Sequence, residues 1–142
     1  MLISDVLKNK EHPFVTTIRE DASVTSLIAL LAEHRIGAVV VSNDGTTIAG
    51  IVSERDIVRC LARDPECLHA SVRDIMTVEV HTCPPQMPVA ELSREMTTRR
   101  IRHVPVVRDD QMVGLVSIGD VVKERIGQLQ DEADHLAEYI QQ

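Results

Sequence analysis

The sequence predicts a mixed α/β (α+β) protein made of two β-α-β-β-α repeats, packed as a pseudo-twofold pair and followed by a long C-terminal helix. Three observations lead to this prediction. The chain matches itself at a shift of roughly 65 residues. Each copy alternates short strands of branched residues with amphipathic helices. The final segment carries apolar residues spaced three and four positions apart.

Composition narrows the function classes. The chain has 142 residues, 44% of them hydrophobic, a net charge of −7 and 1% aromatic residues. Nucleic-acid binders usually carry a basic face and, for single strands, aromatic stacking platforms. The sequence shows neither feature, so no nucleic-acid partner is expected.

Each copy opens with an extended segment, Val15 to Ile18 or Val80 to Cys83. An amphipathic helix follows in both, with apolar residues one helical turn apart. In the first copy these are Val24, Leu27, Ile28 and Leu31, and in the second Val89, Leu92 and Met96.

A strand, a polar turn and a second strand come next. The predicted strands are Ala38 to Ser42 and Ile48 to Val52 in the first copy, and Val104 to Val107 and Met112 to Val116 in the second. Asn43-Asp44-Gly45 and Arg108-Asp109-Asp110 supply the turns. A second helix then begins at Ser53 or Ser117.

These elements divide the chain into repeat 1 with its N-terminal lead-in (1–63), a linker with a short helix (64–78) and repeat 2 (79–126). The lead-in Ile3 to Leu7 resembles the linker segment Val72 to Met76. A unit of about 60 residues buries too little surface to be stable alone, so the two repeats are expected to pack together.

The predicted C-terminal helix spans 117–141. Its apolar positions form a narrow seam spaced four and three apart: Val122, Ile126, Leu129, Ala133, Leu136 and Ile140. Two interpretations are open: the helix packs on its own domain, or it pairs with a second chain. The narrow seam follows a completed fold and favours a homodimer.

The motif that carries chemistry is Gly-apolar-Val-Ser-x-x-Asp, which begins at Gly50 and again at Gly114. A serine followed three residues later by an acid is also a common helix N-terminal cap. The motif recurs at the same strand-to-helix junction in both copies, however. A helix N-terminus attracts phosphate, and a carboxylate one turn later can accept from ribose hydroxyls.

The duplicated unit and this motif, together with the segment Arg102 to Val107, resemble the cystathionine-β-synthase (CBS) domain, which occurs in tandem pairs. The resemblance covers about residues 1–126 and implies a stand-alone regulatory module without catalytic activity. It further implies clefts between the repeats that bind adenosine nucleotides, AMP before NAD(H) or ATP, with ADP and S-adenosylmethionine as further family ligands. No other cofactor is expected to be required.

The resemblance also implies site residues. Asp56 and Asp120 hold ribose, Ser53 and Ser117 meet phosphate, and backbone near Ala38 and Val104 contacts adenine. Thr17 and Ile18 are expected beside Asp120, and Thr82, Cys83 and Pro84 beside Asp56. The segment Arg102 to Val107, which resembles the family's second-strand signature, adds Arg102, His103 and Pro105 to the expected site. Arg102 and His103 are expected to face phosphate in one cleft and Arg55 in the other, so the two clefts should differ.

With no attached enzyme or transporter domain in this sequence, the module is expected to act in trans on a regulated protein that the sequence does not identify. The rival hypothesis is a dimeric protein-interaction module that has lost its ligand. An enzyme is disfavoured because no nucleophile elbow, dinucleotide fingerprint or phosphate-loop lysine occurs. A metal site is disfavoured because a close set such as His81-Thr82-Cys83 supplies only two ligands, too few for a structural site.

Location and redox state follow from the same sequence. The first ten residues include Asp5, Lys8 and Lys10 and do not resemble a signal peptide. No apolar run is long enough to span a bilayer. The three cysteines are an odd number without a C-x-x-C pair, which favours free thiols in the cytoplasm and no membrane partner.

Overall fold

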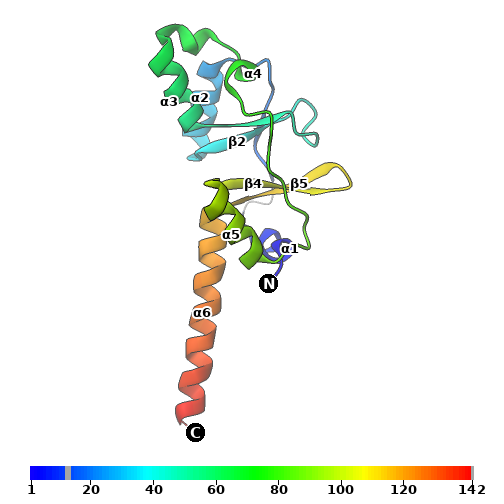
Figure 1. Cartoon of the computed structure of the whole chain (residues 1–142), viewed down its shortest axis with the longest axis vertical. Helices are drawn as coiled ribbons and strands as arrows, with labels where there is room; N and C mark the ends of the chain where they lie inside the picture. Colours follow the sequence, from blue (N-terminus) through cyan, green and yellow to red (C-terminus); the bar gives the residue numbers. More distant parts are fainter. Residues whose placement is uncertain (12–13, 142) are drawn as a thin grey trace.

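Two α+β repeats lie one above the other in the computed structural model, which describes residues 1–11 and 14–141 (Figure 1). Repeat 1 contains β1 (Thr17–Ile18), α2 (Val24–His34), β2 (Ala38–Val41), β3 (Gly50–Ser53) and α3 (Glu54–Arg63). Repeat 2 contains α5 (Val89–Arg99), β4 (His103–Arg108), β5 (Gln111–Ser117) and α6 (Ile118–Gln141). Three short helices complete the fold: α1 (Ile3–Lys8), the 3-10 helix η1 (Pro65–His69) and α4 (Val72–Ile75). The predicted fold class is confirmed.

The sheets of the two repeats differ at their first strand. In repeat 1, β1 pairs parallel with β2, which pairs antiparallel with β3. In repeat 2, β4 and β5 form an antiparallel pair. The predicted first strand of this copy is reduced to a parallel bridge between Cys83 and Val106. Pro84 and Pro85 follow Cys83 immediately, and proline has no N–H with which to continue a ladder.

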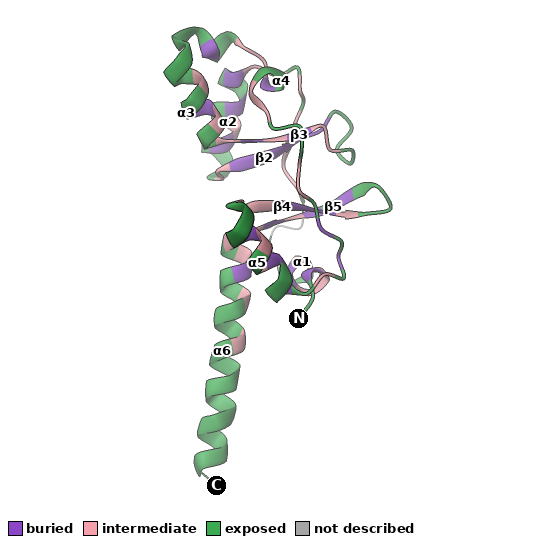
Figure 2. Cartoon of the chain, viewed as in Figure 1, coloured by how far each residue is buried: buried purple, intermediate pink, exposed green. Residues whose placement is uncertain are grey.

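Each repeat has its own apolar core (Figure 2). Each core also includes a short helix that the sequence analysis placed outside that repeat. Ile3 and Val6 of α1 are buried in the core of repeat 2, and Val72 of α4 is buried in the core of repeat 1. The Ile3 N–H donates to the Met87 carbonyl at 2.9 Å, and α4 makes matching backbone contacts with repeat 1. The lead-in therefore packs on repeat 2, although the sequence grouped it with repeat 1.

The cysteines differ from expectation. Cys60 near the end of α3 and Cys67 in η1 form a disulfide, with their Cα atoms 5.9 Å apart. Cys83 is buried and free. The prediction of three free thiols was wrong, because neither the odd number of cysteines nor the absence of a C-x-x-C pair excludes a bridge between residues seven apart. The turn from α3 into η1 reverses the chain over seven residues and brings the two side chains together.

The C-terminal helix extends as predicted, over 24 residues from Ile118 to Gln141. Its first turns contact α1, α5 and β5, and the rest projects away from the two repeats (Figure 1). None of the helices formed by the described residues combines the length and the apolar character needed to cross a bilayer.

Candidate functional site

One candidate site is a cavity of about 550 Å³ where the two repeats meet, here called the Asp56 cleft. Repeat 1 contributes Gly37 and Ala38, part of β3 and the first turns of α3. Repeat 2 contributes the end of α5 and the start of β4. The connecting segment contributes Thr77 and Glu79 to His81. The site therefore exists only when both repeats are folded against each other.

Asp56 lies in the first turn of α3 and performs the capping function that its spacing from Ser53 predicts. The Ser53 N–H donates to Asp56 Oδ2 at 2.8 Å, and the Ser53 hydroxyl donates to the same oxygen at 3.2 Å. Asp56 is half-buried and also lines the cavity. Both cap hydrogen bonds use one carboxylate oxygen, which leaves acceptor capacity on the other.

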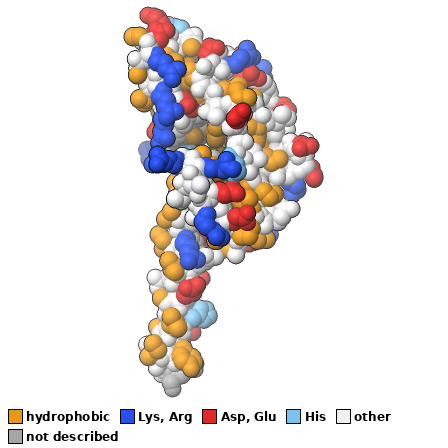
Figure 3. Space-filling view, viewed as in Figure 1, with side chains coloured by type: hydrophobic (Ala, Val, Ile, Leu, Met, Phe, Trp, Pro, Cys, Tyr) orange, Lys and Arg blue, Asp and Glu red, His pale blue; other side chains and the backbone are white. Residues whose placement is uncertain are grey.

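The Asp56 cleft is rich in arginine. Arg55 and Arg59 are one turn apart on α3, and Arg99, Arg100 and Arg102 come from the end of α5 and the loop before β4. The ion pairs found among residues 1–11 and 14–141 involve none of these five guanidinium groups. Figure 3 shows basic side chains gathered along one edge, from α3 to the junction of the repeats. This chain of net charge −7 thus concentrates positive charge around one cavity.

One sequence expectation about these charges was wrong. Arg55 was expected in one cleft and Arg102 with His103 in the other, but all three line the Asp56 cleft. The pseudo-twofold packing places the start of β4 in repeat 2 opposite the start of α3 in repeat 1. Residues at non-equivalent positions of the two copies therefore share a cavity.

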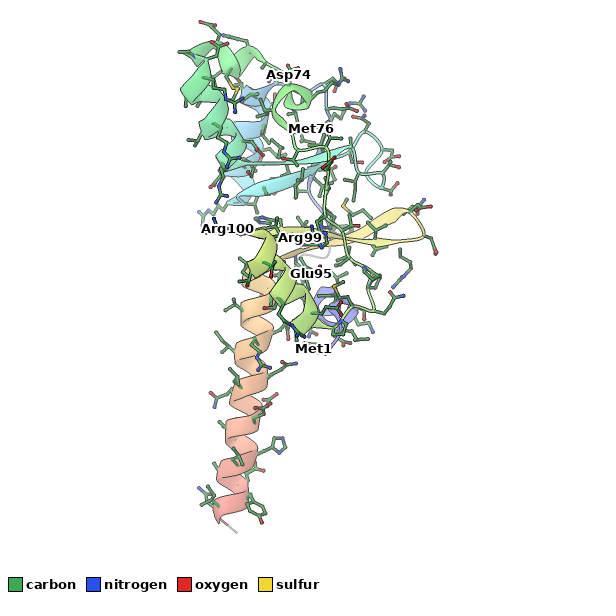
Figure 4. All side chains as sticks on the ribbon, in the orientation of Figure 1. Met1, Asp74, Met76, Glu95, Arg99 and Arg100 are labelled. Carbon is green, nitrogen blue, oxygen red and sulfur yellow. A yellow bond between two sulfur atoms is a disulfide. The ribbon has the colours of Figure 1, made fainter. Side chains whose placement is uncertain are left out.

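Arg100 was not predicted as a site residue. It caps the end of α5 in the left-handed conformation, with φ of 55°, and lies at the junction of the repeats (Figure 4). Arg35 caps α2 with φ of 54° and lines another cavity, which lies at Ser117. Glycine usually occupies this conformation at a helix end. The repeat of arginine at this position in both copies could have indicated a functional role, because a non-glycine residue in the left-handed conformation is energetically unfavourable.

A second cavity, of about 450 Å³, lies at Ser117 and includes Lys10 from the lead-in. The Lys10 ammonium is 3.0 Å from Asp120 Oδ2 and donates to the Leu115 carbonyl at 2.7 Å. Burial raises the pKa of Asp120, but the Ser117 N–H and Lys10 outweigh burial, so this pKa lies below its usual range. Asp120 therefore has a cation partner from its own chain, and it is not among the residues that line this cavity, so the two clefts are unequal.

Several predicted site residues lie outside both cavity walls. Thr17 and Ile18 form β1, and Val15 and Thr16 line the second cavity in their place. Thr77 and Glu79 to His81, rather than Thr82 to Pro84, line the Asp56 cleft. Cys83 is in the core of repeat 2, where burial raises its pKa to about 11. Val104 and Pro105 are buried in β4. In each repeat the residues that line the cleft come just before the first paired residues of the sheet. The spacing of the motifs does not show where this pairing begins.

His103 lines both cavities, and burial lowers its pKa below its usual value. His81, another residue of the Asp56 cleft, has its Nε2 2.6 Å from Glu95 Oε2. In the described part of the chain, no group of three or more His, Cys, Asp or Glu side chains is arranged to hold a metal ion. The Asp56 cleft thus combines a free carboxylate oxygen of Asp56, the N-terminus of α3 and a cluster of arginines. The carboxylate oxygen can accept from hydroxyl groups, and the other two can bind an anion, so the cleft suits a ligand that carries both.

The same two-repeat organisation is found by comparison with known proteins. The CBS domain profile matches residues 3–63 and 72–127. The chain belongs to the CBS domain family. It is 37% identical to the mitochondrial CBS domain-containing protein CBSX3 of Arabidopsis thaliana, over 98% of this chain and 71% of that protein.

Solved structures of CBS proteins have the same fold. A CBS-domain containing protein from Agrobacterium tumefaciens superposes with a TM-score of 0.81 at 39% identity, over 87% of this chain and 92% of that chain. The CBS pair of protein MJ0100 has a TM-score of 0.78 at 26% identity, over 90% of this chain and 98% of that one. That relative was solved in complex with 5′-methylthioadenosine and S-adenosyl-L-methionine.

Proposed function

We propose that this CBS pair is a regulatory module that binds an adenosine nucleotide in the Asp56 cleft. The observation that carries the proposal is the cavity in which Asp56, at the start of α3, lies among five arginines free of ion pairs in the described chain. Asp56 accepts hydrogen bonds from the ribose hydroxyls, while the α3 N-terminus and the arginines bind phosphate. The binding of adenosine compounds by a related CBS pair supports this assignment.

The charge of the cleft favours AMP, ADP, ATP or NAD(H) over S-adenosylmethionine. The five arginines outnumber the three carboxylates of the wall, which belong to Glu54, Asp56 and Glu79. Phosphate groups gain charge-assisted hydrogen bonds from arginine, whereas the sulfonium of S-adenosylmethionine adds another positive charge. AMP remains our first expectation, because a single phosphate is enough to engage the α3 N-terminus and the arginines while Asp56 binds the ribose.

Regulation follows from the position of the cleft, since its walls come from both repeats. A ligand that contacts both repeats stabilises the arrangement it fits best, and its differential affinity shifts the population of arrangements. The surface offered to a protein partner changes with that population. On this proposal the module catalyses no reaction and acts in trans.

A thermal-unfolding scan with AMP, ADP, ATP, NADH, S-adenosylmethionine and inorganic phosphate tests the proposal. A ligand at one hundred times its dissociation constant adds about 2.7 kcal/mol to the free energy of unfolding. For a chain of this size, that corresponds to roughly 5–10 °C in Tm. We expect a selective increase with at least one phosphorylated adenosine compound and none with phosphate alone. No increase with any compound would favour the ligand-free interaction module instead.

Nucleotide affinity should also depend on His103. In the free protein, burial keeps the pKa of His103 low, so the imidazole is neutral at pH 7. A phosphate bound in the cleft favours the imidazolium and raises that pKa, so binding takes up a proton and strengthens as pH falls through the bound-state pKa. A rise of one unit corresponds to a gain of about tenfold. Titration calorimetry from pH 7.5 to 5.5 should show this component, and it should be lost in His103→Gln.

A further inference from the structure

Asp120 has the position in repeat 2 that Asp56 has in repeat 1. The Ser117 N–H donates to Asp120 Oδ2 at 2.9 Å, and the Ser53 N–H donates to Asp56 Oδ2 at 2.8 Å. Asp56 lines its cavity, whereas Asp120 is not among the residues that line the second cavity, although Ser117 and Lys10 are. Equivalent carboxylates are therefore open to a cavity in one repeat and covered in the other.

Lys10 is the residue that separates Asp120 from the second cavity. Its Nζ atom is 3.0 Å from Asp120 Oδ2 and donates to the Leu115 carbonyl oxygen at 2.7 Å. The side chains of Lys10 and Asp120 are 27% and 23% exposed, so salt screens this ion pair less than it screens a pair on the surface. An ammonium group that lines the cavity and contacts Asp120 takes the position that a ribose hydroxyl would need.

The segment that carries Lys10 is longer than its counterpart in the linker. Eight positions separate the ends of Leu7 to Val15, whereas four separate the ends of the equivalent stretch, Met76 to Val80. The shorter stretch contains no lysine or arginine, and it contributes the carboxylate of Glu79 to the wall of the Asp56 cleft. Only the longer lead-in therefore brings a cation to the capping aspartate of the repeat on which it packs.

We propose that Lys10 blocks Asp120 and closes the second cavity to nucleotide, so that the chain binds one nucleotide although the repeats offer two equivalent carboxylates. The ligand class, an adenosine nucleotide, rests on the function proposed above. A ribose that reaches Asp120 must displace the ammonium, which then loses its hydrogen bonds to the carboxylate and to the Leu115 carbonyl. A hydrogen bond to a charged group corresponds to roughly tenfold or more in affinity. Movement of the lead-in away from Asp120 opens a second nucleotide site.

Titration calorimetry of the full chain with AMP, ADP and ATP, each in a separate run, counts the sites. We expect one nucleotide per chain in the parent and two in Lys10→Met and Lys10→Gln, which remove the charge. Lys10→Arg keeps a cation beside Asp120 and should retain one site. Lys8→Met is the matched control and should also retain one, because Lys8 is exposed in the same lead-in and lines neither cavity. Two sites in the parent, or one in both uncharged variants, would overturn the proposal.

Asp56→Asn separates this proposal from the function of the Asp56 cleft. In Lys10→Met combined with Asp56→Asn, the stronger site that remains is at Asp120, and adding Asp120→Asn should remove it. A second site in Lys10→Met that persists after Asp120→Asn would show that Lys10 does not act through Asp120. No binding by the parent but one site in Lys10→Met would contradict the function of the Asp56 cleft and support the block by Lys10. No binding by any of these proteins would overturn both.

Discussion

Asp56→Asn should weaken nucleotide binding by a factor of ten or more. The amide keeps one acceptor oxygen, which the Ser53 N–H engages at 2.8 Å in the parent, and loses the second acceptor and the charge. Hydrogen bonds to a charged group contribute about 1.5–3 kcal/mol, and each 1.4 kcal/mol is a tenfold change in affinity. Titration calorimetry with the nucleotide that gives the largest thermal shift measures the effect directly.

Two equivalent carboxylates provide the controls. Asp74 caps α4 in the same way, with the Ser71 N–H 3.0 Å from its Oδ2, but it is exposed and lies outside the Asp56 cleft. Asp74→Asn therefore reports the effect of a weakened cap alone and should leave affinity within twofold. Asp120→Asn should also have little effect, because Lys10 already neutralises that carboxylate. Parent-like affinity in Asp56→Asn would remove ribose from this site.

Gly50→Ala should lower the free energy of unfolding by about 2–3 kcal/mol, near the upper end of the usual range for overpacking. A Cβ at residue 50 would lie 2.7 Å from the Thr77 carbonyl oxygen and 2.9 Å from Met76 Sδ. Met76 follows α4, which Figure 4 shows above the sheet of repeat 1. Thr77 cannot retreat freely, because its N–H and C=O are both hydrogen-bonded to Ile51, at 2.8 and 2.9 Å.

Gly114, the equivalent residue in repeat 2, gives a matched comparison. A Cβ at residue 114 would lie 2.6 and 2.8 Å from the Cδ2 and Cδ1 atoms of Leu7, and a leucine side chain can change rotamer. Gly114→Ala should therefore cost less than Gly50→Ala. Gly127 in α6 has no atom within 4 Å of such a Cβ, so Gly127→Ala should stabilise the helix by roughly 0.5–1 kcal/mol. Urea unfolding monitored by circular dichroism measures all three, and equal losses at Gly50 and Gly114 would contradict the backbone clash.

Elements of local origin could be predicted from residue spacing. Periodicities of two and 3.6 depend on which residues face a core, so the strands, the helices and the long C-terminal helix follow from the positions of Val, Ile and Leu. The Ser53–Asp56 and Ser117–Asp120 caps join residues three apart and could be predicted equally well. Internal repetition then predicted that the two copies share one architecture and pack together, and the family resemblance implied the clefts between them.

Which parts of the two copies meet could not be predicted in this way. The exchange of α1 and α4 between cores, the grouping of Arg55 with Arg100 and Arg102, the Lys10–Asp120 ion pair and the Cys60–Cys67 disulfide were all absent from the sequence prediction. Each depends on how the chain turns between elements or how one repeat packs on the other. Residue spacing determines neighbours along one helix or strand, but contacts across the pseudo-twofold join depend on the packing of side chains distant in sequence.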